Sequence, residues 1–163
     1  MYLLDSMVVR ELRLARTGSA DPGLVAWAGS VPRQELFLSA QSLLDLQDDA
    51  AGARRRDKAS GAALSEWIAD RVVPAFEGRI LPIDLAVARR SAMLSYAERR
   101  DALLVATALE HGLTLVTQHP STYKIGRPKL FSPWGYTPTE VAEDWRQAAR
   151  GGTQWLKSLF VRV

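Results

Sequence analysis

The sequence predicts an α/β fold in which helices cover both faces of a central, mostly parallel sheet. Short apolar runs of strand length alternate repeatedly with segments of helical period along the 163 residues. Parallel strands need long crossover connections, which are usually helices, so this alternation is typical of a parallel sheet. The length fits one compact domain with a sizeable core, and no internal repeat or low-complexity linker divides it.

Five segments of the sequence predict the strands. Each is a short run that contains Leu, Ile, Val or Phe. The predicted strands are residues 1–4, 35–39, 79–82, 113–117 and 129–134.

The predicted helices lie between these strands. Asp21 and Pro22 mark one helix start, as a cap and a first-turn proline. Ser39 or Ser42 would cap the helix after the second strand, and Gly112 would end the helix before the fourth. The predicted helical segments are residues 8–16, 20–30, 42–56, 63–76 (interrupted at Pro74), 84–100, 101–112 and 137–150, with an apolar stripe over 153–163.

Composition excludes several classes of protein. The chain has no cysteine, which excludes disulfides, thiolate metal sites and cysteine nucleophiles and is compatible with a reducing cytoplasm. No basic segment followed by a long apolar core opens the chain, so we expect no signal peptide. The longest apolar stretch, residues 102–109, is too short to span a membrane, and we expect a cytoplasmic protein without membrane contact.

The net charge is +3 and the pI is near 9.5. A basic cluster lies at residues 54–58, and the last forty residues are also net positive. This balance is compatible with a polyanionic partner, but solvated helix faces carry such charges too.

Three acidic residues are predicted to lie near the carboxyl ends of the parallel strands, where the active sites of such sheets usually form. Asp5 ends the first strand, Asp45 lies in the helix after the second, and Asp101 starts the helix before the fourth. Carboxylates held together repel one another unless a hard cation neutralises them, and Mg²⁺ or Mn²⁺ suits that role. Asp5 and Asp101 could equally be helix caps, and Asp45 could be solvated.

The segments "YLLDSMVVREL", "LFLSAQSLLDL", "RILPIDLAVARR", "DALLVATALEHGLTLVT" and "SPW" occur in this order from Tyr2 to Trp134. Together they resemble the PIN-domain family, and within it the VapC-like toxins of bacterial type II toxin–antitoxin pairs. The resemblance divides the chain into a PIN-like domain, residues 1–135, and a C-terminal helical extension, residues 136–163, packed on the domain or on a partner.

The resemblance implies a three-layer α/β/α fold and a magnesium- or manganese-dependent endoribonuclease. It implies that Asp5, Asp45 and Asp101 are the catalytic residues and metal ligands. The implied partners are RNA, a cognate antitoxin and a second copy of the chain, with DNA reached only through the antitoxin.

The chain departs from the family pattern at four positions. Asp45 replaces the usual Glu, and Met7 stands where an amide is common. His119 and Thr122 stand where the family has Asn and a fourth acid, so the predicted site has one negative charge fewer. Asp48 or Asp49, within a helical turn of Asp45, could compensate, although a solvated pair is the simpler interpretation.

The remaining candidates are residues that would contact RNA: Ser6, Arg99, Arg100, His119 and Thr122. An alternative function is a PIN scaffold with weakened catalysis that is retained as a protein- or RNA-binding module. A receiver-type signalling domain is disfavoured, because "LTLVTQH" has no lysine where such a domain needs one.

Overall fold

The computed structural model describes residues 1–137, which form an α/β domain around a five-stranded sheet. All strands are parallel and are arranged in the order β3-β2-β1-β4-β5. The strands are β1 (Tyr2–Leu4), β2 (Leu36–Ser39), β3 (Ile80–Leu81), β4 (Thr114–Val116) and β5 (Leu130–Phe131). Each of the five strand predictions is therefore confirmed, with shorter bounds.

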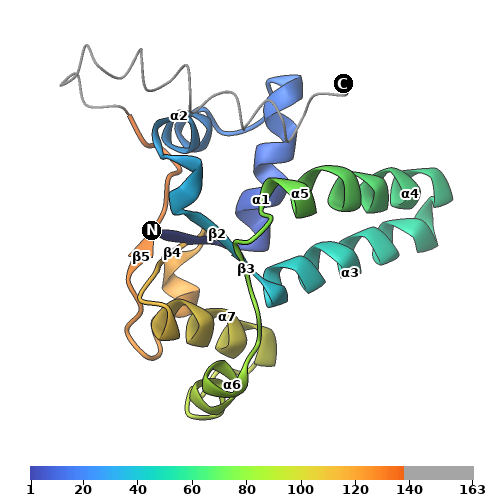
Figure 1. Ribbon diagram of the computed structural model, residues 1–163. Helices are drawn as coiled ribbons and strands as arrows, with labels where there is room; N and C mark the ends of the chain where they lie inside the picture. Colours follow the sequence, from blue (N-terminus) through green and yellow to red (C-terminus); the bar gives the residue numbers. More distant parts are fainter. Residues whose placement is uncertain (138–163) are drawn as a thin grey trace.

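Seven α-helices lie within the described residues (Figure 1). They are α1 (Ser6–Arg13), α2 (Pro22–Ser30), α3 (Ala40–Arg56), α4 (Lys58–Trp67), α5 (Val73–Ala75), α6 (Leu85–Ala92) and α7 (Arg99–Glu110). None of the helices within residues 1–137 is both long and apolar enough to cross a lipid bilayer.

Two apolar cores flank the sheet and give three layers. Leu4 and Val116 face the core that α1, α2, α3 and the segment around α5 cover. Leu3 and Leu115 face the opposite core, which α7 covers. Successive residues of a strand point to opposite faces, so the neighbouring pairs Leu3–Leu4 and Leu115–Val116 supply both cores. The predicted three-layer architecture is confirmed (Figure 1).

Helix starts follow the expected capping chemistry. The side chain of Asp21 accepts from the backbone N–H of Leu24 at 2.9 Å. Of the two candidate serines, Ser39 is the cap of α3, and its hydroxyl accepts from the N–H of Ser42 at 2.9 Å. The Ser42 hydroxyl instead donates to the carbonyl of Leu4, which joins α3 to the end of β1.

The helix predicted over residues 84–100 is wrong in its extent. The chain leaves the helix after Ala92 and returns to it at Arg99. Leu94 and Tyr96 between them pack on the core beneath α7, and the Tyr96 hydroxyl donates to the carbonyl of Ile125. These tertiary contacts outweigh the local helical pattern.

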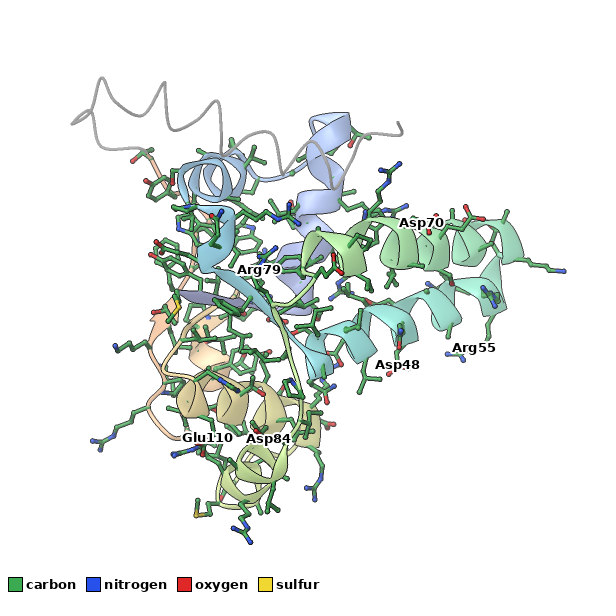
Figure 2. The ribbon with its side chains drawn as sticks, viewed as in Figure 1. Asp48, Arg55, Asp70, Arg79, Asp84 and Glu110 are labelled. Carbon is green, nitrogen blue, oxygen red and sulfur yellow. The ribbon has the colours of Figure 1, made fainter. Side chains whose placement is uncertain are left out.

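Pro74 disturbs its helix as predicted. A π-helical turn, Ile68–Val72, separates α4 from α5, because proline supplies no N–H and its ring crowds the preceding turn. The side chain of Arg79, labelled in Figure 2, donates to the carbonyls of Arg33, Leu36 and Ala75 and ties this segment to the sheet.

The helical extension predicted for residues 136–163 lies outside the described residues from residue 138 onward.

Candidate active site at the carboxyl edge of the sheet

Asp5 occupies the point where β1 ends and α1 begins. Its backbone N–H donates to the carbonyl of Val116 in β4, and its side chain caps α1. The residue is only 4% exposed. Asp5 thus is a helix cap, as one interpretation of the sequence held, and it also lies at the edge where the carboxyl ends of the strands meet.

Four donors surround the carboxylate of Asp5. Oδ1 accepts from the Ser6 hydroxyl at 3.3 Å and from the N–H of Met7 at 3.4 Å. Oδ2 accepts from the Thr117 hydroxyl at 2.9 Å and from the Tyr123 hydroxyl at 3.4 Å. A carboxylate has about four acceptor positions, so these donors fix its orientation.

Thr117 and Tyr123 are site residues that the sequence analysis missed. Thr117 follows β4, the neighbour of β1, and is fully buried. Tyr123 ends a short 3₁₀ helix, Pro120–Tyr123, and is 9% exposed. Burial, followed by repulsion from Asp5, raises the pKa of Tyr123, which therefore remains a protonated donor at neutral pH.

The two positions that replace the family's Asn and acid lie in this loop. Thr122 is exposed, and its N–H donates to the carbonyl of His119. The N–H of His119 donates in turn to the Thr117 hydroxyl. It is Tyr123, next in sequence to Thr122, whose side chain reaches Asp5.

Asp45 lies in the second turn of α3. Gln41, one turn earlier, donates its amide N–H to Oδ1 of Asp45 at 2.9 Å. Burial raises the pKa of the Asp45 carboxyl, Gln41 and Arg100 act to lower it, and Asp5 and Asp49 act to raise it. The charge of Asp5 therefore acts on Asp45.

Asp101 lies in the first turn of α7. The guanidinium Nε of Arg100 lies 3.8 Å from its Oδ1. Burial raises the pKa of Asp101, Arg100 opposes this shift, and the charges of Asp5 and Glu98 add to it. Asp5 therefore acts on both other acids, and Arg100 is the cation that faces Asp45 and Asp101 alike.

A cavity of about 250 Å³ opens beside these groups. Its lining brings Ser6, Asp45 and Arg100 together, three residues that the sequence analysis singled out. Arg99 is exposed and does not line this cavity. The full lining is Ser6, Arg10, Gln41, Asp45, Asp48, Asp49 and Arg100.

Asp48 and Asp49 differ in what they contact. Asp49 forms an ion pair with Arg10 at 2.8 Å. Asp48 lines the cavity and lies on α3, where Figure 2 labels it. Asp49 therefore does not substitute directly for the missing fourth acid, because Arg10 already pairs with the charge of Asp49.

The donor set suits a hard divalent cation, since it consists of carboxylate oxygens. Within residues 1–137, however, no three Asp, Glu or His side chains are gathered closely enough to hold a metal ion together. Mg²⁺ commonly binds through one or two carboxylates and keeps its remaining positions for water and phosphate oxygens. The residues present fit that mode of binding and not an all-protein cage.

The fold and this site define a class of α/β proteins that carry carboxylates at the carboxyl edge of a parallel sheet. No protein-family model matches the sequence. Toxin FitB of Neisseria gonorrhoeae is 30% identical over an alignment of 142 residues, and the match covers 82% of this chain and 99% of that protein. VapC ribonuclease Y4jK of Sinorhizobium fredii is 28% identical over an alignment of 146 residues, and the match covers 82% of this chain and 98% of that protein.

Solved structures of FitB complexes have the same fold. The crystal structure of FitAcB from Neisseria gonorrhoeae superposes with a TM-score of 0.71 at 30% identity, over 82% of this chain and 99% of that chain. FitAB bound to an IR36 DNA fragment also gives a TM-score of 0.71, at 28% identity, over 86% and 99%. This chain belongs to the PIN-domain family of VapC and FitB toxins.

Proposed function

We propose that this chain is the toxin of a toxin–antitoxin pair and acts as a metal-dependent endoribonuclease in the cytoplasm. The observation that carries the proposal is the buried Asp5 carboxylate, which four donors orient and whose charge acts on Asp45 and Asp101. A relative that matches over most of this chain is named a VapC ribonuclease.

We propose that Asp5, Asp45 and Asp101 would share Mg²⁺ or Mn²⁺, with one or two of these carboxylates bound to the ion directly and the rest reaching it through its water molecules. When bound, the ion would supply positive charge against the charge that develops on the phosphate and would lower the pKa of a coordinated water. The donors around Asp5 hold its carboxylate in one orientation, so that it does not have to reorganise during the reaction.

The other residues act through charge and position. Gln41 orients the Asp45 carboxyl, and Tyr123 retains its proton as a donor to Asp5. Arg100, at the rim between Asp45 and Asp101, is placed to contact a phosphate oxygen of the substrate. We propose Ser6 as a second substrate contact, since it lines the same cavity, and His119, Thr122 and Arg99 as peripheral ones.

Partners follow from the same family. The solved FitAcB and FitAB structures are complexes, one of them with DNA. We propose that a cognate antitoxin binds this chain, that the antitoxin makes the DNA contact, and that the chain forms a homodimer. An arginine of the antitoxin would match the acidic edge in charge and geometry.

The test is cleavage of single-stranded RNA by the purified full chain with Mg²⁺, Mn²⁺ or EDTA. We expect cleavage with either metal ion, none in EDTA, and loss of cleavage on Asp5→Asn. Asp70→Asn, at an exposed position outside this site, is the control and should cleave as the parent does. Equal cleavage by Asp5→Asn would exclude the proposal.

Calorimetry tests the alternative function. The missing fourth carboxylate is the observation that favours a binding module with weakened catalysis. Undetectable Mg²⁺ binding and no RNA cleavage, together with intact antitoxin binding, would establish that alternative.

A further inference from the structure

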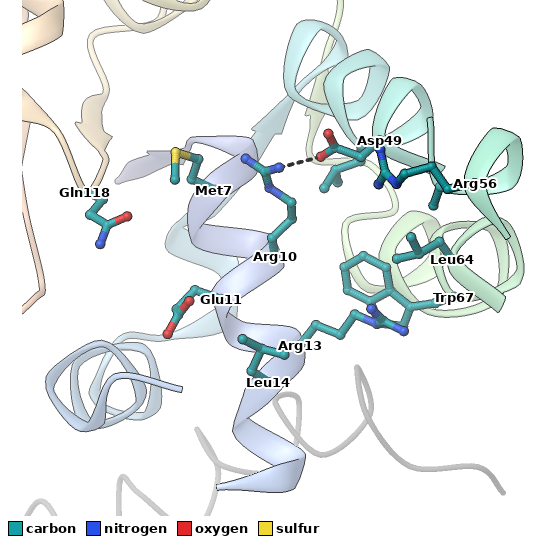
Figure 3. A pocket seen from close by; sticks show the side chains of 12 residues that line it. Met7, Arg10, Glu11, Arg13, Leu14, Asp49, Arg56, Leu64, Trp67 and Gln118 are labelled. Atoms are coloured by element: carbon teal, nitrogen blue, oxygen red, sulfur yellow. Dashed lines mark ion pairs between the residues drawn. The ribbon is translucent and has the colours of Figure 1, made fainter. Parts of the chain in front are cut away.

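A second cavity lies beside the carboxylate site, between α1 and the hairpin of α3 and α4 (Figure 3). Its volume is about 390 Å³, within the range of about 300–1,000 Å³ common for ligand sites. Met7 and Gln118 line it, and each is next in sequence to a residue that donates to Asp5. Trp67 of α4 lines it as well. We call this cavity the arginine pocket, after Arg10, Arg13 and Arg56 in its lining.

The two acids of the arginine pocket are already engaged. Oε1 of Glu11 accepts the backbone N–H of Asp21 at 3.0 Å. Asp49 forms its 2.8 Å ion pair with Arg10, drawn as a dashed line in Figure 3.

Two of the three guanidinium groups keep their charge uncompensated. Arg13 and Arg56 form no ion pair with any residue in 1–137. The pocket therefore presents net positive charge and favours an anionic ligand.

The indole of Trp67 provides an unused donor in the same place. Its Nε1 is buried and has no acceptor among the described residues. Buried N–H groups are nearly always hydrogen-bonded, so a ligand acceptor would complete this one. The guanidinium of Arg13 lies 5.4 Å from the centre of the Trp67 ring, and Figure 3 shows it extending toward that ring.

The arginine pocket and the carboxylate cavity share a boundary. Arg10 and Asp49 line both of them, and their ion pair forms the common wall. A chain with repeated negative charges could therefore lie with one phosphate at the carboxylates and a neighbouring one beside Arg13 and Arg56. A single strand of RNA has this property, because every nucleotide carries one phosphate charge.

We propose that the arginine pocket binds the nucleotide that adjoins the scissile phosphate of a single-stranded RNA substrate. Arg13 and Arg56 contact its phosphate, and the Trp67 N–H donates to a phosphate oxygen or a base carbonyl. This proposal rests on the proposed ribonuclease function and assigns a substrate-binding site outside the carboxylate cluster.

The test measures binding of a fluorescently labelled, mixed-sequence oligoribonucleotide to the full chain in EDTA, over a series of salt concentrations. We expect Arg13→Gln and Arg56→Gln each to weaken binding and to reduce the slope of log K against log salt by about 0.7, the value for one lost phosphate contact. Arg55→Gln is the matched control. It removes the same charge as each of these variants, and it lies next to Arg56 on α3 at an exposed position that does not line the pocket.

Trp67→Phe probes the indole donor separately. It should weaken binding of the oligoribonucleotide without changing the salt slope. Circular dichroism and melting temperature of every variant separate loss of contact from loss of fold.

The outcomes distinguish this proposal from the function on which it rests. If the parent neither binds nor cleaves RNA, the proposed function fails. If the parent binds RNA and the Arg13, Arg56 and Arg55 variants all keep its affinity and salt slope, the arginine pocket is not an RNA site. If the Arg13 and Arg56 variants keep RNA binding but lose a purified cognate antitoxin, the pocket is a protein-binding site and this proposal is overturned.

Discussion

The hydroxyl of Thr117 donates a hydrogen bond to Oδ2 of Asp5 across 2.9 Å, although 112 positions separate the two residues in sequence. The pairing of β1 with β4 makes this contact, because it places Leu4 opposite Val116 and therefore places Asp5 beside Thr117 at the strand ends. The N–H of Asp5 also donates to the carbonyl of Val116. The sheet register thus orients the carboxylate that we place at the centre of the reaction.

Thr117→Val should lower RNA cleavage by about 10- to 100-fold, the usual effect of removing an outer hydrogen bond to a ligand. Valine nearly matches threonine in shape but leaves Oδ2 of Asp5 with only the longer bond from Tyr123. Thr117→Ser keeps the hydroxyl and should retain most of the activity. The measurement is the initial cleavage rate against Mg²⁺ concentration, and equal rates for the valine and serine variants would contradict a role in orientation.

Arg100→Gln should lower cleavage about tenfold at neutral pH, corresponding to a charged hydrogen bond of about 1.5 kcal/mol to the substrate. The charge of Arg100 lowers the pKa of both Asp45 and Asp101. Its removal raises both pKa values, so activity should be lost at a higher pH on the acidic side of the pH–rate profile. Arg99→Gln is the neighbouring control and should leave that side of the profile in place. Unchanged profiles for both variants would show that Arg100 does not act on the carboxylates.

The fold could be predicted from sequence because its signals are local. Leu3 and Leu4 mark a strand that is buried on both faces. Asp21 followed by Pro22 marks a helix start. Both signals can be recognised without knowledge of the rest of the sequence. Helix extent was less predictable. The break between Ala92 and Arg99 depends on the tertiary contacts of Leu94 and Tyr96. The hydrophobic periodicity of the segment does not predict these contacts.

In the candidate site, too, some residues could be predicted from sequence and others depend on the tertiary structure. The places of Asp5, Asp45 and Asp101 follow from the rule that chemistry collects at the carboxyl ends of parallel strands. The contacts of Thr117 and Tyr123 with Asp5 span 112 and 118 positions and depend on sheet register and on the path of a loop. Gln41 was within reach of sequence reasoning, since it lies four residues before Asp45 on one helix.

Asp45→Asn should stabilise the protein more at neutral pH than in acid. Burial raises the pKa of Asp45 in the folded state above its ordinary value of 3.8. As the pH rises above 3.8 the unfolded chain loses this proton first, so the folded state binds more protons and the free energy of unfolding falls through the window up to the raised pKa. An asparagine does not titrate, so its advantage should grow across that window and then level off.

Urea denaturation of the parent and of Asp45→Asn, at a series of pH values from 3.8 to neutral, measures this difference. Asp70→Asn, at an exposed position on the turn between α4 and α5, is the control and should show no comparable growth. A constant difference between the parent and Asp45→Asn would show that the carboxyl is not affected by its burial.

Gly61→Ala should destabilise the fold by about 1–3 kcal/mol, because the added methyl group overpacks a close helix crossing. A Cβ at Gly61 in α4 would lie 2.4 Å from the Cα of Arg54 in α3, so the backbone of one helix would have to move. Gly52→Ala, within α3, is the control, since its Cβ would meet only the flexible end of Arg55 at 3.7 Å. That change should stabilise the helix by about 0.5–1 kcal/mol. Thermal or urea unfolding of both variants checks the opposite signs. Because α3 and α4 also form a wall of the arginine pocket, Gly61→Ala should weaken RNA binding as well, whereas Gly52→Ala should leave it unchanged.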